Sequence, residues 1–156
     1  MVKAQKFLEV CKKCKATCCK MGGSDFSRKE MQKVIRAGFK NNFVKINNNH
    51  YELKSKKGIC PYLAKDNSCK IHKIKPLMCT CWPVCIDLIN GKKRFYLAYC
   101  PMTKLLSKDE IKKCEKEARK MPNAMLEESF HISKLPKADL RLIRKRFNKF
   151  KKVKIK

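Results

Sequence analysis

The sequence contains no long apolar run. No stretch approaches the roughly 18 apolar residues that a membrane-spanning helix needs. The first fifteen residues, MVKAQKFLEVCKKCK, include neither the apolar core nor the small-residue cleavage site of a signal peptide. We therefore expect a cytoplasmic protein, and clustered cysteines in such a reducing compartment usually bind metal.

The motifs of several common enzyme classes are also missing. The sequence has no Ser-His-acid arrangement, no phosphate-binding glycine loop and no dinucleotide-binding fingerprint. Assignment as a hydrolase, a kinase or a dehydrogenase therefore has no support. Because chemistry at a bound metal needs few other residues, the sequence leaves open whether the protein is an enzyme.

Acidic residues are scarce. The 156 residues include 13 Asp and Glu against 40 Lys and Arg, which gives a formal net charge of +27. Such a surface attracts RNA and other polyanions through electrostatic steering and the release of counterions. A lysine-rich genome would produce the same excess, so the charge makes RNA a candidate partner without establishing one.

Cysteine, in contrast, is abundant, with eleven in the chain. Residues 11–20 read CKKCKATCCK, in which Cys11 and Cys14 have the spacing that lets two sulfurs chelate one ion. The adjacent Cys18 and Cys19 point about 100° apart on a helix and to opposite faces of a strand. We expect this doublet to supply two neighbouring metal positions or to bridge two ions. If the segment were one helix, Cys11, Cys14 and Cys18 would share one stripe.

Further cysteines follow in GICPYLAKDNSCKIHKIKPLMCTCWPVC and in AYCP. This order of motifs closely resembles that of the YkgJ-type cysteine-cluster family: the doublet, then C-P-Y-L, then C-K-I-H-x-x-K-P-x-x-C-x-x-W-P, and then C-P. This family is also called the CxxCxxCC zinc- or iron-chelating domain. The resemblance covers roughly residues 8–113.

The resemblance implies a compact domain that chelates metal through recurring cysteines. The matched positions, and thus the implied metal ligands, are Cys11, Cys14, Cys18, Cys19, Cys60, Cys69, Cys79 and Cys100. The chain departs from the family pattern in having three residues between Cys14 and Cys18 where the family has two. It also has His72 where Tyr is usual, a possible nitrogen ligand, and Lys75 where Arg is usual.

The other cysteines and histidines have different expectations. Cys81 and Cys85 either join the metal site or face the core, because alternation along CTCWPVCIDLI is expected to form a strand. Cys114 is expected only to pack on a helix. His50 and His131 are expected to be ordinary surface residues, because neither has a second ligand type at metal spacing nearby.

The identity of the metal stays open, since all-thiolate sites accept zinc, iron and iron–sulfur clusters alike. We favour zinc as the single choice, although the doublet also suits a multinuclear iron site. Three functions remain: a structural or interaction domain, an iron–sulfur or multinuclear iron enzyme of redox or methyl-transfer type, and a metal storage or delivery protein. The second is suggested by larger proteins with similar clusters, such as flagellin lysine methylases.

Local patterns predict an α+β fold, a small single domain of short helices and β-hairpins organised around a cysteine-ligated metal centre. Ser27 with Glu30, and Ser107 with Glu110, have capping-box spacing and predict two helix starts. Gly38 is available to stop the first of these helices. Residues 43–54 and 85–100 predict two β-hairpins, and the second contains an Asn-Gly pair that suits a type I′ turn.

The chain is expected to divide near residue 135. Residues 1–135 would form the cysteine-cluster domain, and residues 136–156 a basic amphipathic C-terminal helix and tail. In a helix, Leu140, Ile143, Phe147 and Phe150 would line one side and basic residues the other.

Overall fold

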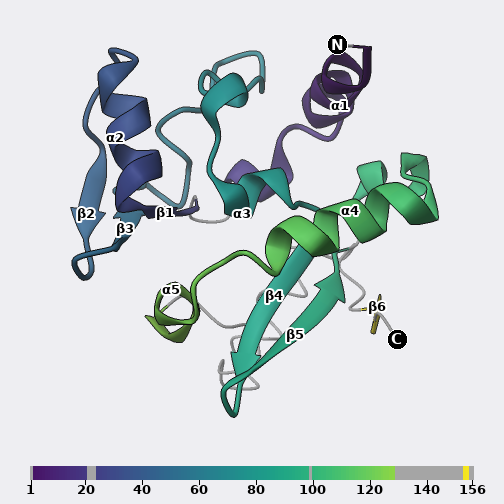
Figure 1. Ribbon diagram of the computed structural model, residues 1–156. Helices are drawn as coiled ribbons and strands as arrows, with labels where there is room; N and C mark the ends of the chain where they lie inside the picture. The colour runs from purple at the N-terminus through teal and green to yellow at the C-terminus, as the bar shows by residue number, and fades with distance from the viewer. Residues whose placement is uncertain (1, 21–23, 99, 129–152, 155–156) are drawn as a thin grey trace. The chain divides into compact units, whose positions relative to one another are not determined.

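The computed structural model describes residues 2–20, 24–98, 100–128 and 153–154, and Figure 1 shows the order of their helices and strands. Short helices accompany small antiparallel sheets, which confirms the expected α+β class. The chain divides into two compact units, residues 1–79 and 80–156, and each is described here by itself. The expected division near residue 135 and the helix expected over 136–150 both lie outside the described residues.

The first unit combines helical segments with one three-stranded sheet. Its elements are α1 (Val2–Lys13), the 3₁₀ helix η1 (Thr17–Lys20), β1 (Asp25–Ser27), α2 (Arg28–Arg36), β2 (Phe43–Lys45), β3 (His50–Leu53), the 3₁₀ helix η2 (His72–Ile74) and α3 (Leu77–Thr80), which extends one residue beyond the unit. The strand order is β1-β3-β2, with both pairs antiparallel. The β2–β3 pair confirms the first expected hairpin.

Helix α2 begins and ends where the sequence predicts. The Ser27 hydroxyl accepts a hydrogen bond from the Glu30 amide, and the Glu30 carboxylate accepts one from the Ser27 amide at 2.8 Å. The helix stops before Gly38, whose φ of +82° lies in the left-handed region that glycine adopts without penalty. Val34 is fully buried.

The apolar core of this unit lies on the face of the sheet to which Phe26, the middle residue of β1, points. Its buried members are Phe26, Val34, Leu53, Tyr62 and Ile71. The rings of Phe26 and Phe43 meet edge to face, with centroids 4.9 Å apart. Cys60 and Cys69 pack against this cluster, so the cysteine-bearing loop is joined to the core.

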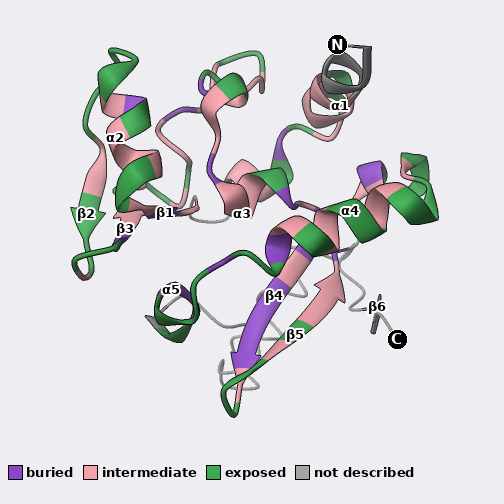
Figure 2. Ribbon diagram, viewed as in Figure 1, coloured by how far each residue is buried: buried purple, intermediate pink, exposed green. Residues whose placement is uncertain are grey.

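The second unit is built on a hairpin. Its elements are β4 (Val84–Ile89), β5 (Lys92–Leu97), the 3₁₀ helix η3 (Pro101–Leu105), α4 (Lys108–Ala118), α5 (Asn123–Glu128) and β6 (Val153–Lys154). Asn90 and Gly91 have φ values of +52° and +70°, as a type I′ turn requires, so the second expected hairpin is confirmed. The capping box at Ser107 is confirmed too. Helices α4 and α5 both contact β4, the more buried strand of the hairpin in Figure 2.

One local expectation is wrong. The sequence CTCWPVCIDLI suggested a single strand, but Cys79 lies in the short helix α3 and the strand begins only at Val84. Pro76 precedes α3, where its fixed φ and missing amide hydrogen are compatible with a helix start.

Candidate metal centre

The first cysteine segment folds as two helical pieces separated by a reversal. Helix α1 carries Cys11 and ends at Lys13. Lys15 and Ala16 then have positive φ values of 57° and 50°. The 3₁₀ helix η1 follows and carries Cys18 and Cys19. Cys14, Lys15 and Ala16 therefore form a turn, and a single helix that carries the first three cysteines is excluded.

The second cysteine segment lies against the first. The Cys60 amide donates a hydrogen bond to the Cys19 carbonyl at 2.8 Å. Two lysine side chains add further links: Lys20 Nζ donates to Asn67 Oδ1 at 2.9 Å, and Lys12 Nζ lies 3.3 Å from Asp66 Oδ2. Residues some fifty positions apart in the sequence are thereby held side by side.

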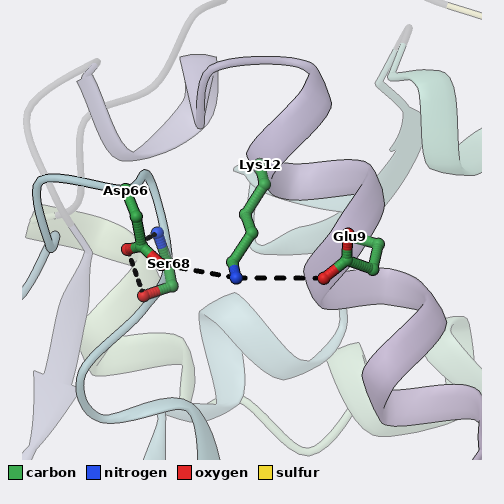
Figure 3. Close-up of polar contacts among 4 residues, drawn as sticks. All are labelled: Glu9, Lys12, Asp66 and Ser68. Atoms are coloured by element: carbon green, nitrogen blue, oxygen red, sulfur yellow. Dashed lines mark hydrogen bonds and ion pairs between the residues drawn. The ribbon is translucent and has the colours of Figure 1, made fainter.

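Figure 3 shows how Lys12 makes its link between Glu9 and Asp66. Its Nζ lies 3.8 Å from Glu9 Oε1 within α1 as well as near Asp66. Asp66 accepts hydrogen bonds from the hydroxyl of Ser68 at 2.6 Å and from its amide at 3.0 Å. These bonds, with the Lys12 charge, lower the pKa of Asp66 to about 2, so its carboxylate is ionised across the physiological range.

A closed turn brings Cys60 and Cys69 together. Leu63 and Cys69 form an antiparallel bridge, and the Ala64 amide donates to the Ser68 carbonyl at 2.9 Å. Asn67 takes the left-handed conformation at the tip, with φ of 62°. Because the ends of the turn meet, both thiols lie at its base, beside the apolar core.

Glu30 positions the helix that carries Cys79. While one of its oxygens closes the α2 capping box, its Oε1 accepts a hydrogen bond from the Leu77 amide at 2.7 Å. Leu77 is the first residue of α3, and Cys79 is the third. A single carboxylate thus fixes the start of α2 and the start of α3.

The adjacent Cys18 and Cys19 share a hydrogen bond that separates their acidities. It lowers the pKa of Cys19 to about 7, assisted by the charges of Lys75 and Lys20 and opposed by burial. The same bond, burial and the nearby Cys19, Cys11 and Cys79 raise the pKa of Cys18. Cys19 therefore ionises first, and Cys18 keeps its proton.

Burial is the largest influence on the pKa values of Cys60, Cys69 and Cys79. It raises the pKa of Cys60 to about 11 and that of Cys79 to about 12, and it also raises the pKa of Cys69. Lys75 opposes this effect at Cys69 and Cys79. A divalent cation that bound these sulfurs would favour their thiolate forms far more strongly than one ammonium group does.

The thiols that influence one another's pKa values form one group, which we call the thiol cluster. Its members are Cys11, Cys18, Cys19, Cys60, Cys69 and Cys79, with Cys14 beside Cys11 through an Sγ-to-carbonyl contact of 3.3 Å. Soft sulfur donors in this number fit zinc, iron or an iron–sulfur cluster. Seven of the eight expected ligands thus come from the first unit.

The cluster is not closed tightly. Among the described residues, one group of potential ligands has all its donor atoms within 4.8 Å of one another, and it contains no sulfur. Its members are Asp25, His50 and Glu52. The sulfurs would therefore have to move toward a bound metal.

The remaining cysteines belong to the second unit. Cys100 immediately precedes η3, and its role as the eighth ligand stays a prediction from the sequence. Cys81 is buried, and Cys85 is half-buried on β4 with its Sγ 3.9 Å from the Pro83 carbonyl. Cys114 is half-buried on α4.

One of the three histidines, His50, differs from its expected position at the surface. His50 is 0% exposed, so its prediction as a surface residue is wrong. Sequence reasoning missed it because its ligand-type neighbour Asp25 comes from a distant strand. The His-x-Glu alternation at residues 50–52 was the one available signal. His72 lies on η2, where burial and the Lys75 charge lower its pKa and so favour the neutral ring. His131 lies outside the described residues.

Comparisons with known proteins place these observations in a family. Within the described residues, no helix has both the length and the apolar character needed to cross a membrane. Neither the curated proteins nor the solved structures gave a match to the chain. A family model described as "CxxCxxCC: Putative zinc- or iron-chelating domain" matches residues 10–128, a span that contains every member of the thiol cluster. The chain belongs to this family of zinc- or iron-chelating domains, as its cysteine pattern predicted.

Proposed function

We propose that the protein binds zinc or iron through the thiolates of the thiol cluster, in a paired or multinuclear site. The observation that carries this proposal is the convergence on Cys19, whose ionisation affects the thiols of Cys18, Cys60, Cys69 and Cys79. With seven members, the thiol cluster also has more sulfurs than the four ligands of a single tetrahedral site. A bridging Cys19 thiolate, shared by two ions, would use all of them.

The metal would act first as a structural centre. The residues near the cluster are held by short turns and a few hydrogen bonds, and the unit contains a modest apolar core. Binding energy at such sites is folding energy. We therefore expect loss of metal to loosen residues 11–20 and 60–69 before it affects the sheet.

Substitution of single thiols tests the ligand assignment. Cys60→Ala and Cys79→Ala should each lower the metal content of anaerobically purified protein and its unfolding midpoint. Cys114→Ala is the matched control, because Cys114 is half-buried on a helix of the other unit. Equal metal content in all three variants would remove the basis of the proposal.

Elemental analysis with an absorption spectrum distinguishes the kinds of site. About two zinc ions per chain without a visible band favour a structural or interaction domain. Iron with broad visible absorption favours the redox or methyl-transfer alternative, in which the metal would supply electron transfer or an open coordination position. Metal that exchanges readily with a chelator favours storage or delivery. We place the protein in the cytoplasm, where its cysteines would stay reduced and available to bind metal.

A second proposal concerns the charge. A net charge of +27 supports binding of RNA or another polyanion, beyond the metal site. The test is RNA binding across a salt series. A steep loss of affinity with added salt supports a phosphate-binding surface, and no binding at about 50 mM salt excludes it.

A further inference from the structure

A second group of metal-ligating side chains lies in the first unit, on the sheet. Strands β1 and β3 pair so that Asp25 stands opposite Glu52 and Ser27 opposite His50. Directly opposed residues project to the same face, and so do residues two apart on one strand. Asp25, His50 and Glu52 therefore share one face, while Phe26 on the other face enters the apolar core.

The three side chains meet closely. Their ligand atoms all lie within 4.8 Å of one another. His50 Nε2 is 3.2 Å from Asp25 Oδ1, and the His50 and Asp25 side chains are 1% and 14% exposed. Two ligand atoms about 2.1 Å from one metal ion are about 3.0 to 3.4 Å apart at octahedral or tetrahedral angles. The imidazole-to-carboxylate distance already falls in that interval.

The charges at this place are unusual for the protein. Two of the 13 acidic residues stand directly opposite each other in a chain with 40 Lys and Arg. Like charges at directly opposed positions destabilise a strand pair. A bound cation would remove the repulsion between the two carboxylates.

We propose that Asp25, His50 and Glu52 form a binding site for a divalent transition-metal ion, separate from the thiol cluster. One imidazole nitrogen and two carboxylates are ligands that suit Mn²⁺, Fe²⁺ or Zn²⁺, and the two negative charges balance the ion. Binding displaces the proton at the His50–Asp25 contact to solvent, because Nε2 must offer its lone pair. The donor sets differ in softness, so Mn²⁺ should bind this site in preference to the thiol cluster.

Manganese is the probe that distinguishes the sites, because Mn²⁺ favours carboxylate and imidazole ligands over thiolates. The full chain, purified with its native metal, is titrated with Mn²⁺, and free Mn²⁺ is measured by electron paramagnetic resonance. We expect about one bound ion per chain, with affinity that falls as the pH drops because protons compete with the ion for its ligands. Glu52→Gln and Asp25→Asn should each weaken binding by about tenfold or more.

Glu9→Gln is the matched control, since it removes the same charge at an exposed position of the same unit and should leave Mn²⁺ affinity unchanged. Equal affinity in the control and in both site variants overturns the proposal. So does the absence of Mn²⁺ binding by the unaltered protein, which would leave His50 as a partner in an ordinary ion pair.

A measurement on the unaltered protein avoids the possibility that a variant misfolds. Bound Mn²⁺ broadens the NMR signals of nearby nuclei, so substoichiometric Mn²⁺ should selectively broaden the ring signals of His50. Broadening of the His72 ring with a sharp His50 signal would show that the ion binds elsewhere, and the proposal would be wrong.

Discussion

Glu30 offers the sharpest test of how the fold positions a metal ligand. Its carboxylate accepts hydrogen bonds from Ser27 in the capping box and from the Leu77 amide at the start of α3. Glu30→Gln keeps one oxygen for the capping box, in which Gln is also accepted. The new amide nitrogen then faces the Leu77 N–H, so that two donors meet.

The expected loss follows from that mismatch. A hydrogen bond to a charged acceptor contributes about 1.5 to 3 kcal/mol, and an unsatisfied buried donor has a penalty of about 1 to 3 kcal/mol. Since this contact is only partly buried, we expect Glu30→Gln to lower the free energy of unfolding by about 2 kcal/mol. Urea denaturation followed by circular dichroism gives the value. Metal affinity should fall as well, because α3 carries Cys79.

The matched control is Glu110→Gln, which changes the capping box of α4. Helix α4 carries none of the thiol cluster, and Gln retains the cap, so we expect a change within about 0.5 kcal/mol and no loss of metal. If the two variants were equally stable and bound metal equally well, the Glu30–Leu77 bond would have no role in holding Cys79.

Two further predictions concern charge and backbone. Lys75→Gln removes a positive charge that lowers the pKa of Cys19, so the Cys19 thiolate fraction at pH 7 should fall. In metal-free protein, alkylation of Cys19 should then slow severalfold, and an unchanged rate would exclude this effect of Lys75. Gly91→Ala places a Cβ at a φ of +70° with open space around it. The free energy of unfolding should therefore fall by about 1 kcal/mol through backbone conformation alone, and an unchanged melting temperature would contradict that.

Local sequence signals predicted much of the secondary structure. Each capping box needs only four consecutive residues, and the Asn90-Gly91 turn only two, so these elements could be identified without knowledge of the fold. The strand expected through Cys79 failed because alternation of apolar residues does not identify a strand when a proline-started helical turn precedes it.

The candidate sites were predictable to different degrees. The thiol cluster could be anticipated because cysteine spacing and family resemblance both indicate metal. The group around His50 could not, because it depends on the register between β1 and β3, and register is set by long-range packing of Phe26 and its neighbours.

The reversal at Lys15 and Ala16 has a consequence for minimal mimics of the cluster. Left-handed backbone at a residue with a Cβ is disfavoured by about 1 to 2 kcal/mol. Ala16 is 1% exposed, so surrounding residues of the folded chain hold it in this conformation. A synthetic decapeptide with the sequence of residues 11–20 would relax toward ordinary helix or coil. Its sulfurs would present another geometry to a metal, and its affinity would be a poor guide to that of the protein.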